Sequence, residues 1–187
     1  MRKARSTTPK DRPPKPLTRI LGAILAGGQS RRFGSDKARA LYKGEPLIDH
    51  VVRRMGAQTE STIVVGRSDV QYTTIPDQPP GGHGPLAGLN AALISARDDG
   101  FDAVLSAGVD VPNLPEDLVT TLAGDGAAIV RSQPVVGLWP VAVADELGVF
   151  LKEGGRALYG FAERIGARQI AFDPPLMNVN EPGDLGG

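Results

Sequence analysis

A glycine pair followed by three cations is the part of this sequence best suited to chemistry. Gly27 and Gly28 are followed by Arg31, Arg32 and Lys37. Glycines let a backbone turn tightly and bring its N–H groups against a bulky anion. Arginine grips a phosphate with two hydrogen bonds, and lysine acts as a compact point charge. The segment predicts contact with a phosphate-rich ligand, and the alternative is an ordinary strand-to-helix turn with surface cations.

Two aspartates could complete such a site. Asp110 follows an apolar run and precedes Pro112. Mg²⁺ prefers hard oxygen ligands and commonly takes one or two carboxylates together with phosphate oxygens and water. Asp110 suits that demand, and its alternative role is to cap a turn. Asp77, just before Pro79 and Pro80, has the same two interpretations, ligand contact or turn cap.

Alternating apolar segments must position these residues. Runs rich in β-branched residues that end at glycine or proline predict strands, and apolar positions spaced by three and four predict helices. We expect strands over residues 19–25, 62–65, 72–75, 102–107, 127–131, 135–139 and 168–172. We expect helices over residues 46–55, 86–96, 115–122, 143–152 and 156–165.

Strands separated by helices imply βαβ units and therefore a mainly parallel sheet. The predicted fold class is α/β, a three-layer α/β/α arrangement with a mostly parallel, Rossmann-like sheet, forming one domain over residues 19–187. In such sheets the ligand lies beyond the carboxyl ends of the strands. This places three loops on one rim, over residues 26–37, 77–86 and 108–113.

Composition excludes several classes of site. The absence of cysteine excludes a disulfide framework, a thiolate zinc site and a cysteine nucleophile. Only two histidines occur, His50, which we expect to be structural, and His83, whose role stays open. No apolar run approaches the roughly 18 residues that span a bilayer, and no secretory signal pattern is present. We therefore expect a cytoplasmic protein with no membrane contact.

Charge is unevenly spread along the chain. The formal net charge is zero, yet residues 1–18 carry six basic residues against Asp11, which leaves the remainder acidic. An acidic body argues against a nucleic-acid binder of the usual basic kind. The first 18 residues also contain four prolines and no periodic apolar pattern, which predicts a disordered, solvated tail rather than a contact with RNA or membrane.

The complete glycine-rich segment resembles a family signature. Residues 25–37 read L-A-G-G-Q-S-R-R-F-G-S-D-K, which is neither a Walker A loop nor a G-x-G-x-x-G fingerprint. The segment is similar to the phosphate-binding loop of the MobA-type nucleotidyltransferases, with Phe33 where methionine is usual. Three further segments resemble the same family in order, G-P-L-A-G at 84–88, G-V-D-V-P-N-L-P at 108–115 and V-N-E-P-G-D-L at 179–185.

The resemblance implies a function and a set of contacts. Members of that family, which have the fold of the nucleotide-diphospho-sugar transferases, move GMP from GTP to molybdenum-loaded molybdopterin and release pyrophosphate. It also implies Mg²⁺ as cofactor, partnership with a molybdenum insertase and molybdoenzyme chaperones, and a monomer or weak oligomer. The implied nucleotide contacts are Leu25, Ala26, Gly27, Gly28, Lys37, Asp77 and Asp110. The implied catalytic residues are Lys37, Arg31 and Asp110, Asp110 also being the implied metal ligand. The implied contacts with the pterin substrate are Asn178 and Asn180.

Two departures from the family pattern stand out. Gly66-Arg67 occupies the position where the family often has asparagine, and Gln133-Pro134 replaces a common His-Pro. Two alternatives stay open: a cytidylyl or other nucleotidyltransferase of the same fold, and a non-catalytic nucleotide-binding homologue. The Gly27-Gly28 pair favours guanylyl transfer over the Ala-Ala-Gly loop of the cytidylyl relatives.

Overall fold

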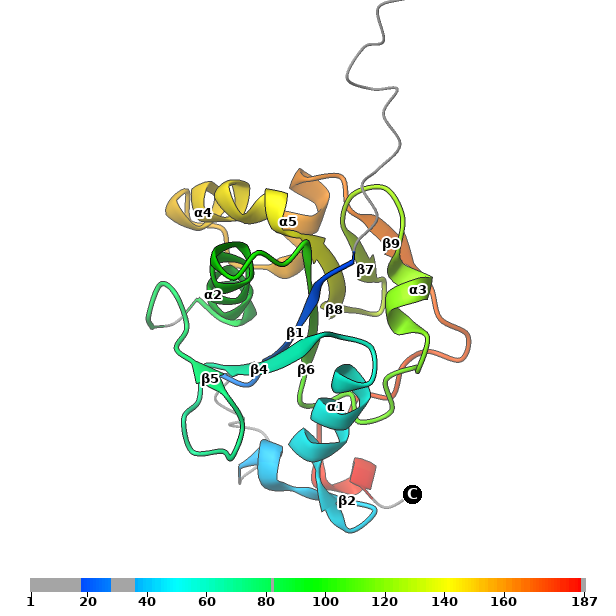
Figure 1. Cartoon of the computed structure of the whole chain (residues 1–187). Helices are drawn as coiled ribbons and strands as arrows, with labels where there is room; N and C mark the ends of the chain where they lie inside the picture. The colour runs from blue at the N-terminus through cyan, green and yellow to red at the C-terminus, as the bar shows by residue number, and fades with distance from the viewer. Residues whose placement is uncertain (1–17, 28–35, 82, 186–187) are drawn as a thin grey trace, which may run out of the picture.

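Figure 1 shows the computed structural model of the chain. The described residues are 18–27, 36–81 and 83–185. The predicted tail up to residue 17 lies outside them, as do the site predictions for Gly28 and Arg31. Thr18 belongs to the folded domain, because its backbone N–H and its hydroxyl both donate to Asp102 Oδ2, at 3.0 and 2.9 Å.

One mixed sheet of seven strands organises the described residues, in the order β5-β4-β1-β6-β8-β7-β9. The strands are β1 Ile20–Leu25, β4 Ser61–Val65, β5 Thr74–Ile75, β6 Ala103–Gly108, β7 Ala128–Val130, β8 Gln133–Pro140 and β9 Arg168–Ile170. The four strands β5, β4, β1 and β6 run parallel, whereas β8 is antiparallel to both of its neighbours. The predicted, mostly parallel sheet is thus confirmed, with one reversal at β8.

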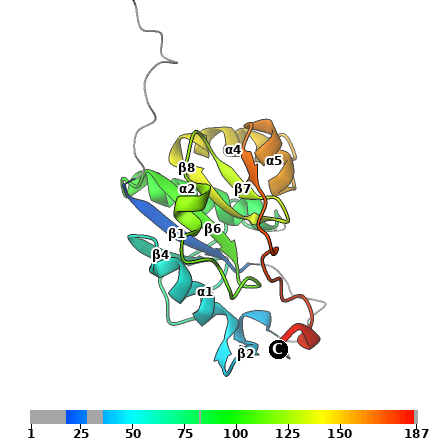
Figure 2. The same cartoon turned by 90° about the vertical axis from the view of Figure 1, so that its right-hand side faces the viewer.

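Helices cover both faces of the sheet, as the two views in Figures 1 and 2 show. They are α1 Leu47–Gly56, α2 Pro85–Asp98, α3 Leu118–Leu122, α4 Ala144–Lys152 and α5 Leu158–Arg164. One apolar cluster joins α2, α4 and α5 to the sheet, and a second joins α1 and α3 to its other face. The three-layer prediction is therefore confirmed.

Short elements connect these layers. They are the 3-10 helices η2 Lys37–Arg39, η3 Val141–Val143 and η4 Pro182–Leu185, and the two-stranded pair of β2 Leu41–Tyr42 with β3 Glu45–Pro46. His50 on α1 has a structural contact, with its Nε2 2.7 Å from the carbonyl oxygen of Tyr42. No described helix is long and apolar enough to cross a membrane.

The core under β6 and β8 contains one polar contact that is fully satisfied. Trp139 is completely buried, and its Nε1–H donates to Ser106 Oγ at 2.8 Å. The Ser106 hydroxyl in turn donates to the carbonyl oxygen of Val135 at 2.7 Å. This pairing offsets the cost of burying a hydroxyl and an indole N–H, and it fixes β8 near Val135.

Candidate active site

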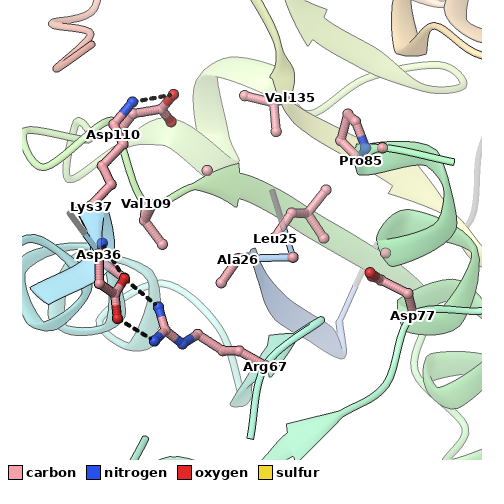
Figure 3. A pocket seen from close by; sticks show the side chains of 15 residues that line it. Leu25, Ala26, Asp36, Lys37, Arg67, Asp77, Pro85, Val109, Asp110 and Val135 are labelled. Carbon is pink, nitrogen blue, oxygen red and sulfur yellow. Dashed lines mark hydrogen bonds and ion pairs between the residues drawn. The ribbon is translucent and has the colours of Figure 1, made fainter. Parts of the chain in front are cut away.

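A cavity of about 350 Å³ opens at the carboxyl ends of β1, β4 and β6, as parallel-sheet topology predicts. Figure 3 shows how side chains from separate loops point into it. All three loops expected on one rim contribute to this cavity. Its lining residues are Leu25, Ala26, Gly27, Asp36, Lys37, Ala38, Arg67, Asp77, Gly84, Pro85, Gly88, Gly108, Val109, Asp110 and Val135.

Lys37 and Asp110 meet across this cavity. Lys37 Nζ lies 3.4 Å from Asp110 Oδ2, and the lysine side chain is only 11% exposed. The same Nζ lies 3.5 Å from Asn180 Oδ1, so residues from three distant parts of the sequence converge on one ammonium group. The sequence predicted the proximity of Lys37 and Asp110 from topology, whereas only the family resemblance pointed to Asn180.

The oxygen atoms around Lys37 fit a magnesium ion that is coordinated partly by the protein and partly by a phosphate. Asp110 supplies a carboxylate that is 27% exposed, and Asn180 supplies an amide oxygen that approaches the same ammonium group. Nowhere in the described ranges do three or more histidine, aspartate or glutamate side chains cluster into a metal site. Mg²⁺ does not need such a cage, because phosphate oxygens and water fill its remaining positions.

Asp77 lies in a cradle formed by three glycines. A Cβ built on Gly27 would come within 2.5 Å of Asp77 Oδ2, and one on Gly88 would lie 3.3 Å from Asp77 Oδ1. Gly66 closes the third side, with its hypothetical Cβ 3.0 Å from the same oxygen. Burial raises the pKa of this carboxyl above its ordinary value.

The carboxylate of Asp77 makes no hydrogen bond to any residue in the described part of the chain, so the turn-cap alternative is not supported. Desolvated acceptors of this kind gain most from a partner that brings N–H donors. Among the described residues no donor therefore competes with a ligand for Asp77, and its contact with a ligand stays a prediction.

The amino end of α2 also faces the cavity. Gly84 and Pro85 line the wall, and no acidic residue occurs in the first turn of α2. Gly84 provides no side-chain cap, so backbone N–H groups at this helix end have no side-chain acceptor at the N-cap. Such an end carries a partial positive charge and favours phosphate or carboxylate groups.

Arg67 is a site residue that sequence reasoning marked only as part of a departure from the family pattern. It lies just after β4, separated from Val65 only by Gly66, lines the cavity and keeps its side chain 13% exposed. Its hydrogen bonds hold the pKa of Asp36 below the ordinary value. The signal that could have revealed it is position, because β4 neighbours β1 and the two strands end at the same rim.

The carboxyl-terminal segment is tied into the site at several points. Val179 is fully buried and packs against Leu47, and its N–H donates to the Asp110 carbonyl oxygen at 2.9 Å. The buried Gln133 donates through Nε2 to the carbonyl oxygens of Leu176 and Met177, at 3.2 and 3.4 Å. Figure 2 shows this segment, coloured towards red, running down beside the sheet to the region of β2.

Two sequence candidates lie apart from the contacts described so far. Asn178 is exposed and makes no hydrogen bond to Lys37 or Asp110, so its predicted substrate contact stays a prediction. His83 lies at the loop before α2, with its Nδ1 3.0 Å from Arg156 Nη1, and it does not line the cavity.

Known proteins share both the sequence pattern and the fold. Residues 22–167 match the family model of the MobA-like NTP transferase domain. A molybdenum cofactor guanylyltransferase of Cereibacter sphaeroides is 39% identical over 183 residues, with 89% of this chain and 94% of that protein covered. A protein of the same name from Rhizobium johnstonii is 34% identical over 187 residues, with 89% and 90% covered.

A solved structure provides a comparison of the fold. The crystal structure of molybdopterin-guanine dinucleotide biosynthesis protein A from Archaeoglobus fulgidus aligns with a TM-score of 0.72 and 24% sequence identity. The alignment covers 89% of this chain and 95% of that chain. At this identity the likeness shows a shared fold.

Proposed function

Because this chain belongs to the family of MobA-like NTP transferase domains, we propose that it is a molybdenum cofactor guanylyltransferase that moves GMP from GTP onto molybdenum-loaded molybdopterin. The observation that carries the proposal is the 3.4 Å approach of Lys37 Nζ to Asp110 Oδ2 within the rim cavity. A buried cation beside a carboxylate suits a triphosphate that is bound together with a divalent ion.

The reaction is a displacement at the α-phosphorus of GTP. An oxygen of the terminal phosphate of molybdopterin forms the new P–O bond, the bond between the α-phosphorus and its bridging oxygen breaks, and pyrophosphate leaves with that electron pair. A phosphate monoester already carries close to two negative charges at neutral pH, so no strong general base is needed. Catalysis then depends on alignment and on neutralisation of charge.

Each part of the site has a role in that displacement. Lys37 neutralises charge on the phosphates, and the amino end of α2 adds a partial positive charge to the same cavity. Leu25, Ala26 and Gly27 form the floor against which the nucleotide lies. Asp77 accepts hydrogen bonds from the N–H groups on one edge of guanine, which replaces the solvation it loses on burial.

Asp110 and Asn180 are the residues that would hold Mg²⁺. When bound, the ion supplies Lewis-acid neutralisation of phosphate charge. Asp110 also keeps Lys37 in place through their ion pair, and its backbone carbonyl anchors the carboxyl-terminal segment through Val179. Asn180 thereby reaches the same point as Lys37, where acceptor and nucleotide phosphates have to meet.

Several finer expectations accompany this proposal. We expect a molybdenum insertase to supply the acceptor and molybdoenzyme chaperones to receive the product. A cytoplasmic location and a monomeric or weakly oligomeric state remain predictions as well.

The test is release of pyrophosphate from GTP in the presence of Mg²⁺ and molybdenum-loaded molybdopterin, with CTP and ATP in parallel. We expect turnover with GTP that depends on both the metal and the acceptor. Turnover with CTP and none with GTP would replace guanylyl with cytidylyl transfer. Binding of GTP without pyrophosphate release from any nucleotide would indicate a non-catalytic binding protein.

A further inference from the structure

Four charged side chains form a cluster at the edge of the active-site cavity, on the side of η2. Arg67 Nη1 and Nη2 donate to the two oxygens of Asp36, at 3.0 and 2.6 Å, in the parallel pair drawn in Figure 3. Arg67 Nε and Nη2 also donate to Asp69, at 2.7 and 2.8 Å. Arg39 closes the cluster with a 2.8 Å bond to Asp69 Oδ2.

Every nitrogen of the Arg67 guanidinium is thus engaged by a carboxylate. A mostly buried arginine that binds two carboxylates, each through two hydrogen bonds, is held in one orientation. Any other orientation would leave the arginine and both carboxylates without their charged partners. The pKa of Asp69 is held well below its ordinary range, chiefly by its hydrogen bond from Arg67. Four of its five N–H donors are thus taken by carboxylates, so Arg67 acts on the site chiefly through its neighbours.

The neighbour that matters is Asp36, which precedes Lys37 directly. Asp36 Oδ1 accepts the backbone N–H of Ala38 at 3.1 Å, so the same carboxylate caps η2 and receives Arg67. The helix η2 has only three residues, and 3-10 turns of that length have little stability of their own. Burial of Ala38 fixes one side of the turn, and the pair with Arg67 fixes its start.

We propose that Arg67 is a positioning residue that, through Asp36, holds the backbone of Lys37 so that its ammonium group stays opposite Asp110. This inference rests on the proposed function, since it assigns Arg67 a part in the use of GTP. The paired side chains of Arg67 and Asp36, called the clamp below, link the end of β4 to the turn that carries Lys37. These two elements share no backbone hydrogen bond in the described part of the chain. It also gives Arg67, which stands where the family pattern departs, a definite task.

The experiment is a double-mutant cycle with Arg67→Ala and Lys37→Ala, measured as pyrophosphate release at varied GTP with Mg²⁺ and saturating acceptor. We expect Arg67→Ala to lower kcat/KM for GTP by about 10- to 100-fold, because a misplaced catalytic group costs that much. The KM for the acceptor, measured separately at saturating GTP, should stay within about twofold. In the Lys37→Ala background, Arg67→Ala should cost little more, since the group it positions is already gone.

Arg67→Lys separates a clamp from a simple charge. Lysine keeps the positive charge and loses the planar fork, so we expect it to restore only part of the activity. Arg164→Ala is the matched control, because Arg164 is likewise held by two carboxylates, Glu146 and Glu153, on α4 and the segment after it. Its loss should change stability and leave the kinetics with GTP unaltered.

The outcomes separate this inference from the proposed function. Additive losses in the cycle, or full activity of Arg67→Lys, would overturn the clamp while the enzyme assignment stands. Should Arg67→Ala fail to fold, Asp36→Asn keeps an oxygen for the cap, removes the charged pair and must give the same kinetic pattern. If the wild-type protein releases no pyrophosphate, the cycle is measured as GTP affinity by calorimetry, and absence of GTP binding overturns both proposals.

Discussion

Replacing Gly66 with alanine should cost stability for two separable reasons. Gly66 has a φ of +85°, a conformation that costs an L-residue about 1–2 kcal/mol. An added Cβ would lie 2.5 Å from Gly27 Cα and 2.8 Å from Gly27 N, and these backbone atoms must move. Overpacking of this kind typically costs about 1–3 kcal/mol. The sum is about 2–5 kcal/mol, which lowers Tm on the order of 10 °C in a chain of this size.

Two other glycines isolate the contributions. Gly154 has a φ of +90° with nothing within 4 Å of its hypothetical Cβ, so Gly154→Ala should show the conformational cost alone. Gly148 lies inside α4 with equally open surroundings and no unusual φ, so Gly148→Ala should raise stability, by about 1 kcal/mol at most.

Thermal unfolding followed by circular dichroism, with and without GTP, provides the measurement. We expect Gly66→Ala to lose clearly more stability than Gly154→Ala, and to lose GTP affinity as well, because the new methyl group also presses on Asp77 Oδ1 at 3.0 Å. Equal losses in the two variants would refute the argument that Gly66 and Gly27 must touch.

Three further changes test the site. Asp110→Ala should reduce turnover by about 100-fold or more, as loss of a preorganised charge does, with circular dichroism unchanged; near-normal turnover would remove Asp110 from the metal site. Because burial raises the pKa of Asp77, the folded state binds more protons than the unfolded chain, and stability falls as pH rises from the ordinary pKa through the raised one. Asp77→Asn should therefore raise the Tm of the ligand-free protein at about pH 7.5, and this gain should shrink towards about pH 4. An equal gain at both pH values would show that the buried charge of Asp77 is not the cause. Gln133→Leu leaves the carbonyl oxygens of Leu176 and Met177 without their donor, which should lower the free energy of unfolding by about 1–3 kcal/mol in chemical denaturation. It should also raise the KM for the acceptor more than the KM for GTP. Equal changes in both KM values would contradict the idea that Gln133 positions the segment that carries Asn180.

The regular elements could be predicted because their patterns are long or strongly marked. The strand predicted over residues 19–25 is observed as β1, Ile20–Leu25, and the helix predicted over residues 86–96 is observed as α2, Pro85–Asp98. The reversal of β8 was not predicted, although only two residues separate it from β7 and a connection that short requires an antiparallel pair. Among the elements of two or three residues, β5, β7 and β9 lie within predicted strands, whereas η2, β2 and β3 were missed because no apolar run marks them.

The site divides along a similar line. Lys37 and Asp110 could be brought together from the sequence because both follow strands of one parallel sheet, whose carboxyl ends share a rim. The Arg67 clamp could not be predicted, since it depends on side-chain directions in two loops that only tertiary structure defines. The same holds for Gln133, whose amide reaches carbonyl groups more than forty positions further along the chain.

The contact between Lys37 and Asn180 spans 143 positions of sequence. A ligand bound by both residues would connect the last part of the described chain to one of its first turns. Ligand binding and the ordering of the carboxyl-terminal segment are therefore thermodynamically linked. Protection from amide exchange on adding nucleotide and acceptor should consequently extend into residues 176–181, far beyond the loops that line the cavity. Catalytic activity should then depend on correct folding of the whole domain and not only of its glycine-rich turn. An activity assay would therefore report on the native state of the entire domain.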